Sequence, residues 1–136
     1  MPPGRRGTNK IGLCLLCLFL CSFVAAFPGC GIQPDPDVRI TFEVEPQPPR
    51  VGQVTITVSV TRSGNPITGA QIKFELNMSH AGMGPVFAEA REVEPGQYRA
   101  NAQLTMAGDW SLFVSVNMPD GTRSYQSFDI KGVAPA

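Results

Sequence analysis

Hydrophobic and polar residues alternate along most of the chain after residue 37. The clearest stretch covers residues 54–61, where every second position is Val or Ile and the positions between them are Thr or Ser. This period of two is typical of a β-strand with one face in a core and the other in water, and β-branched residues favour the same conformation. The pattern therefore predicts a strand here.

The same alternation recurs in six further stretches. These are residues 38–45, 72–78, 86–93, 97–105, 110–117 and 124–130. Turns rich in Gly, Pro, Asn or Asp separate them, and no amphipathic helix pattern lies between them. The number and spacing of these strands predict an all-β domain at residues 38–133, an immunoglobulin-like antiparallel β-sandwich of about seven strands.

The alternation also indicates which side chains face the core. Val58, Phe74 and Leu112 are expected at its centre. Met78 continues the inward set of its strand, and Trp110 begins another such set, so both are interpreted as core residues.

Tyr98 stands just after a turn that contains Gly96. We expect one of two arrangements. Either the Tyr98 hydroxyl hydrogen-bonds back to the backbone, as in a tyrosine corner, or Tyr98 is simply a half-buried strand residue. Met118 lies beside Pro119 and is expected to be a turn residue.

The N-terminal segment has the order of an export signal. Arg5, Arg6 and Lys10 precede an uncharged stretch at residues 11–27. A membrane-spanning helix needs about 20 apolar residues, and this run is shorter, so a signal peptide is favoured over an uncleaved single-pass anchor.

Cysteine positions refine the export prediction. Three of the four cysteines lie inside the apolar run, which leaves Cys30 alone after it. Residues 26–31 resemble a bacterial lipoprotein cleavage site, in which the cysteine after a small residue receives a diacylglycerol. We expect residues 1–30 to be a signal peptide of this type, with lipidation of Cys30 holding the protein to the membrane outside the cytoplasm. Ordinary cleavage after Ala26, giving a secreted or periplasmic protein, is the alternative.

The remainder of the 136-residue chain is large enough for one domain. Residues 31–37 are polar and proline-rich, which predicts a tether. All eleven acidic residues and only eight of the eleven basic ones follow Cys30. This net negative charge argues against a nucleic-acid partner.

His80 and Met83 lie outside the strand pattern on a glycine-containing segment. Imidazole and thioether groups suit Cu(I), a soft ion. The sequence therefore predicts a copper site that uses His80 and Met83, with Met78 or Met106 as further ligands. A competing interpretation is that Met78 and Met106 are core side chains, because Met106 continues the inward alternation of its strand.

Catalysis has little support in the sequence. The single histidine has no serine or cysteine partner at a recognisable spacing, and no phosphate-binding loop or zinc-protease motif is present. The protein is therefore not expected to be an enzyme.

Three segments, in this order, resemble the YtkA-like domain family and its FixH-like relatives. They are residues 78–85 (Met-Ser-His-Ala-Gly-Met-Gly-Pro), 94–98 (Glu-Pro-Gly-Gln-Tyr) and 106–110 (Met-Ala-Gly-Asp-Trp). The resemblance implies an extracytoplasmic Ig-like module, often anchored to the membrane and associated with copper handling and terminal-oxidase assembly. Family members often carry further histidines in the first segment, whereas this chain has only His80.

Two function classes follow. The first is a copper-binding accessory protein of the cell envelope. The second is a metal-free Ig-like module that binds another envelope protein, and a component of a transporter assembly is a third possibility.

Overall fold

β-Strands form all the regular structure in the described part of the chain. The computed structural model describes residues 35–80 and 82–136, so the predicted signal peptide, Cys30 and the tether up to residue 34 lie outside it. No helix within these two ranges has the length and hydropathy needed to cross a membrane. The strands are β1 (Val38–Glu45), β2 (Gly52–Arg62), β3 (Asn65–Pro66), β4 (Gln71–Met78), β5 (Val86–Glu94), β6 (Gln97–Leu104), β7 (Gly108–Asn117) and β8 (Arg123–Val133).

The seven strands predicted from the alternation are confirmed. The largest differences are at three strands that extend beyond their predicted bounds: β2 begins at Gly52, β7 begins at Gly108 and β8 continues to Val133. The additional strand, β3, has two residues that pair with the end of β2. A strand of this length carries no periodic signal in the sequence.

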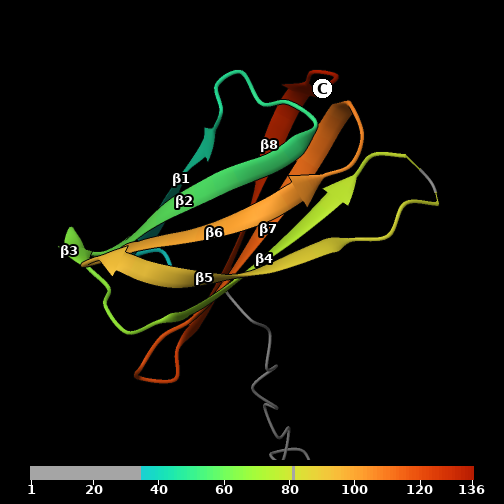
Figure 1. Cartoon of the computed structure of the whole chain (residues 1–136). Helices are drawn as coiled ribbons and strands as arrows, with labels where there is room; N and C mark the ends of the chain where they lie inside the picture. Colours follow the sequence, from blue (N-terminus) through green and yellow to red (C-terminus); the bar gives the residue numbers. More distant parts are fainter. Residues whose placement is uncertain (1–34, 81) are drawn as a thin grey trace, which may run out of the picture. The chain divides into compact units, whose positions relative to one another are not determined.

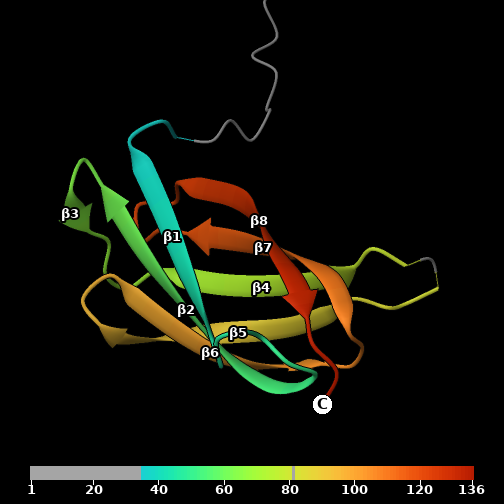
Figure 2. The same cartoon turned by 90° about the horizontal axis from the view of Figure 1, so that it is seen from above.

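The strands are antiparallel, in the order β1-β2-β6-β5-β4-β7-β8, and they form two layers that cross each other (Figures 1 and 2). β5 belongs to both layers. Its first part, residues 86–90, pairs with β4, and its last part, residues 91–94, pairs with β6. The architecture is therefore the predicted Ig-like β-sandwich, with β5 passing from one sheet to the other.

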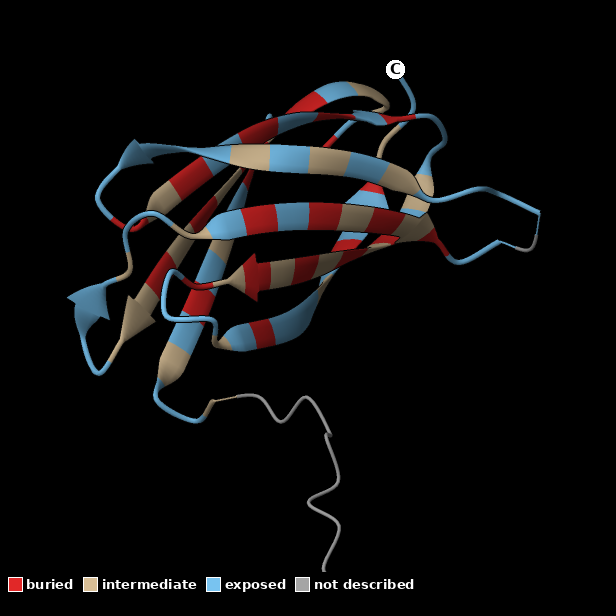
Figure 3. Cartoon of the chain, turned by 90° about the horizontal axis from the view of Figure 1, so that it is seen from below, coloured by how far each residue is buried: buried red, intermediate tan, exposed pale blue. Residues whose placement is uncertain are grey.

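The core lies between the two layers, and buried residues alternate with exposed ones along the strands, as Figure 3 shows. The largest fully buried side chains are Trp110, Tyr98 and Phe74. Val58 and Leu112 are also fully buried, which confirms the three central positions expected from the sequence. Side chains of this size contribute much of the hydrophobic stabilisation of a small domain.

The two outermost strands of the order approach each other through aromatic rings. Phe42 on β1 and Phe128 on β8 have ring centroids 4.5 Å apart, with the planes tilted by 40°. Near the C-terminus Arg50 and Ala134 form a parallel bridge, in which the Val51 N–H donates to Ala134 O at 2.8 Å. The ring contact joins β1 to β8, and the bridge joins the segment before β2 to the residue after β8.

Tyr98 is fully buried, so the half-buried alternative is wrong. Its hydroxyl donates to Ile67 O at 2.7 Å and accepts the Ala70 N–H at 3.0 Å. The bonds to backbone agree with the tyrosine-corner interpretation, but the bonded loop connects β3 and β4 and lies far away in sequence. Burial raises the pKa of the Tyr98 phenol.

Replacing Tyr98 by phenylalanine is expected to lower the free energy of unfolding by about 1–3 kcal/mol, because two partly buried backbone groups lose their partner. Chemical denaturation followed by the fluorescence of Trp110, the single tryptophan, measures this change. Tyr125→Phe is the matched control, since Tyr125 is about half exposed at 48% and its change should stay within about 0.5 kcal/mol. Equal effects of the two variants would contradict the structural role of the Tyr98 hydroxyl.

A charged cluster marks the end of the domain where the described chain begins. The Arg62 guanidinium donates to Asp120 Oδ2 at 2.8 Å and lies 3.4 Å from Asp35 Oδ2. The bond from Arg62 lowers the pKa of Asp120 to about 2. Met118, expected only as a turn residue, is buried there, and its sulfur accepts a hydrogen bond from Arg62 Nη2 at 2.9 Å.

Candidate metal centre

Two loops meet at the opposite end of the sandwich. Met78, the last residue of β4, pairs with Trp110 near the start of β7. The β4–β5 loop therefore begins beside the loop that joins β6 to β7. Ser79 links the β4–β5 loop to the start of β7, because its N–H and its hydroxyl donate to Asp109 O at 3.4 and 3.3 Å.

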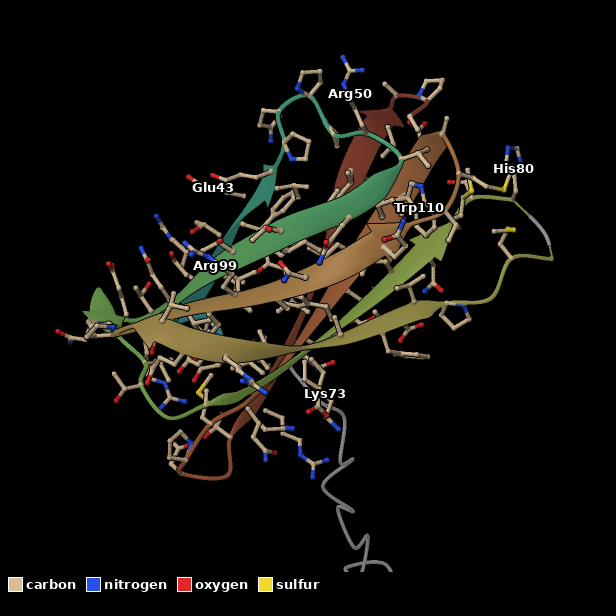
Figure 4. All side chains as sticks on the ribbon, in the orientation of Figure 1. Glu43, Arg50, Lys73, His80, Arg99 and Trp110 are labelled. Carbon is tan, nitrogen blue, oxygen red and sulfur yellow. The ribbon has the colours of Figure 1, made fainter. Side chains whose placement is uncertain are left out.

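His80 and Met83 lie on the β4–β5 loop, on either side of Ala81, which is outside the described residues. His80 is exposed, and Met83 is 37% exposed. Neither side chain belongs to the core, as expected from their positions outside the alternation. Figure 4 shows His80 beyond the end of β4, in a region where sulfur atoms are drawn in yellow.

Met78 is a core side chain. It is 9% exposed, and its methyl carbon lies 3.0 Å from the point that a Cβ on Gly108 would occupy. This close approach agrees with the packing interpretation of Met78.

The core interpretation of Met106 is wrong. β6 ends at Leu104, so the alternation stops before Met106, which is 43% exposed. The Trp110 indole N–H donates to Met106 O at 3.0 Å and holds the backbone of this loop against the core. The backbone of Met106 is thus fixed while its thioether remains accessible.

The structure therefore places three accessible donors, His80, Met83 and Met106, on two adjoining loops at one end. One imidazole and two thioethers fit a soft monovalent cation such as Cu(I). In the described ranges, His, Cys, Asp and Glu side chains form no group of three or more that could hold a metal ion. The proposed lipidation site, Cys30, lies outside these ranges.

An aromatic surface on the outer face of β5, β4, β7 and β8 was not recognised from the sequence. Phe87 on β5 is 70% exposed. In the strand register Glu75 of β4 pairs with Phe87 on one side and with Phe113 of β7 on the other. Phe113 in turn stacks on Tyr125 with centroids 5.8 Å apart. The sequence signal that could have revealed this surface was the presence of aromatic residues at outward positions of the predicted strands.

The fold and the two loops define an Ig-like β-sandwich module with accessible methionine and histidine side chains at one end. The YtkA-like family matches residues 33–122, and the chain belongs to this family. The match confirms the resemblance drawn from the three segments. No curated protein sequence matches the chain significantly.

Solved structures share the fold. A DUF4426 family protein from Pseudomonas aeruginosa superposes with a TM-score of 0.59 at 18% identity, over 76% of this chain and 96% of that one. A DUF4785 family protein from Legionella pneumophila has a TM-score of 0.50 at 10% identity, over 73% of this chain but 29% of the Legionella chain. At these identities the likeness concerns the fold alone.

Proposed function

We propose that this protein is an extracytoplasmic accessory protein, anchored by a lipid on Cys30, that binds Cu(I) through the loop end in copper handling or oxidase assembly. The observation that carries the proposal is the joint exposure of His80, Met83 and Met106 on two adjoining loops. None of these side chains belongs to the buried core, and their donor atoms suit Cu(I). Membership of the YtkA-like family adds the association with copper that the sequence resemblance implied.

The test is a Cu(I) titration under a competing chelator, with the cysteine thiols alkylated so that only imidazole and thioether groups can bind. The wild-type protein is expected to bind, and the His80→Ala, Met83→Ala double variant to lose most of the affinity, because two of three accessible donors are gone. Stability should change by no more than about 0.5 kcal/mol, since both positions are exposed.

Three single variants refine the ligand set. Met106→Leu is expected to weaken binding, whereas Met118→Leu, at the opposite end of the domain, should leave it unchanged. Met78→Leu separates a core role from a ligand role. If Met78 only packs in the core, a leucine of similar volume leaves the Cu(I) affinity unchanged, and if Met78 is a ligand, the affinity falls. Equal affinity of the wild-type and the double variant would refute the copper proposal.

A metal-free interaction module is the second candidate, and the aromatic surface of Phe87, Phe113 and Tyr125 favours it. Exposed aromatic side chains are enriched where proteins bind one another. A photo-crosslinking residue at position 87 should then capture a discrete envelope protein, while one at position 57, on the outer face of the other sheet, should not. Identical labelling from both positions would contradict this alternative.

A further inference from the structure

Two arginines stand opposite each other on the outer face of the sandwich. Arg91 on β5 and Arg99 on β6 are partners in the antiparallel register, and both are exposed. Like charges directly opposite in a sheet are destabilising. The ion pairs found in the described part of the chain involve Arg62 and Lys73 but neither of these arginines.

Neighbouring polar groups add hydrogen-bond donors to this pair. The Arg99 Nε donates to Thr57 Oγ1 at 3.2 Å, which holds this guanidinium along the outer face. Asn101 is two residues further along the same face, and its Oδ1 accepts the Thr55 hydroxyl at 3.0 Å. Because the amide oxygen is engaged, the NH₂ group of Asn101 is left to act as a donor.

The arginines line a hollow of about 340 Å³ at the point where β5 leaves β6 for β4. Asn101 also lines it, as does one carboxylate, Glu89. Glu89 faces Lys73 across the β4–β5 ladder, with its Oε1 3.8 Å from Lys73 Nζ, so its negative charge has a partner outside the hollow. Figure 4 shows Arg99 and Lys73 on opposite sides of β5.

We propose that this hollow, lined by Arg91, Arg99 and Asn101, binds a phosphate group. The two guanidinium groups offer charged N–H donors that suit phosphate oxygens, Arg99 through its Nη groups because its Nε donates to Thr57. A dianionic oxyanion would relieve the repulsion that the register imposes on the arginines. The site is independent of the loop end, because its residues lie on β5 and β6 and include none of the proposed copper ligands.

Calorimetric titration of the full chain in non-ionic detergent tests the site, with inorganic phosphate and glycerophosphoglycerol as separate probes. Arg91→Gln and Arg99→Gln are each expected to weaken binding by about tenfold or more, the usual loss for a charge-assisted hydrogen bond. Arg123→Gln removes the same charge from an exposed position on β8 and should leave binding unchanged. Tighter binding of inorganic phosphate identifies a free phosphate as the ligand, and tighter binding of the diester identifies an anionic lipid headgroup.

A stability measurement separates binding from a merely structural role. Arg91→Gln should raise the midpoint of denaturant unfolding in the absence of phosphate, because it removes one of two opposed like charges. Arg91→Lys keeps the charge but loses the fork, so it should weaken binding without that rise. Absence of binding by either probe, or an equal loss in Arg123→Gln, would overturn the proposal.

Discussion

Truncation of Phe74 to alanine is expected to lower the free energy of unfolding by about 3–5 kcal/mol. Phe74 is fully buried in the middle of β4, between Ala88 of β5 and Val114 of β7 in the register. The loss combines the transfer free energy of the ring with the cavity that rigid neighbouring strands leave open. A domain of this size has about 5–15 kcal/mol of stability in total, so the variant should unfold at a much lower denaturant concentration.

The matched control is Phe87→Ala. It removes the same ring from β5, but at a position that is 70% exposed, so the change should stay within about 0.5 kcal/mol. Both variants can be followed by Trp110 fluorescence. If the two cost the same, the assignment of inner and outer faces on β4 and β5 would be wrong.

The second large effect is expected at Gly96, in the turn between β5 and β6. Its φ is +76°, and a Cβ added there would stand 2.6 Å from the Pro66 Cβ and 3.0 Å from Val60 O. The close approach is fixed because the Val60 N–H donates to Gly96 O at 2.8 Å. Gly96→Ala should therefore cost about 2–4 kcal/mol through backbone strain and overpacking together.

Gly121→Ala isolates the backbone contribution. Gly121 has a φ of +86°, but an added Cβ would meet nothing within 4 Å. We expect a loss of about 1–2 kcal/mol from the left-handed conformation alone. Denaturation curves of the two variants give the difference, and a smaller loss for Gly96→Ala than for Gly121→Ala would contradict the packing of the turn against β3.

The strands and their inner faces could be predicted from the sequence because most strands have one face toward the core, which imposes a period of two. The same rule misled at Met106, since the alternation in the sequence runs past the residue at which pairing stops. Tyr98 shows another limit. Its hydroxyl bonds to a loop far along the chain, and no local pattern encodes that contact.

The sequence predicted the candidate ligands one by one, but not how they lie relative to one another. Absence from the alternation marked His80 and Met83 as loop side chains, and both are exposed. Their proximity to the loop of Met106 depends on the pairing of Met78 with Trp110, a register between strands distant in sequence. The opposition of Arg91 and Arg99 depends likewise on a register, which shifts between residues 92 and 94.

The two ends of the sandwich carry different groups. Asp35, the first described residue, is held by Arg62 beside the β7–β8 turn, whereas His80 lies at the end of the sheet where β7 begins. The eight residues from Trp110 to Asn117 separate these ends by roughly 25 Å, at about 3.3 Å per residue. A molecule held by its N-terminal side would carry the histidine and methionine loops at its far tip. If the proposed lipid on Cys30 anchors the protein, such a separation would leave this tip free to meet a protein that projects from the same membrane.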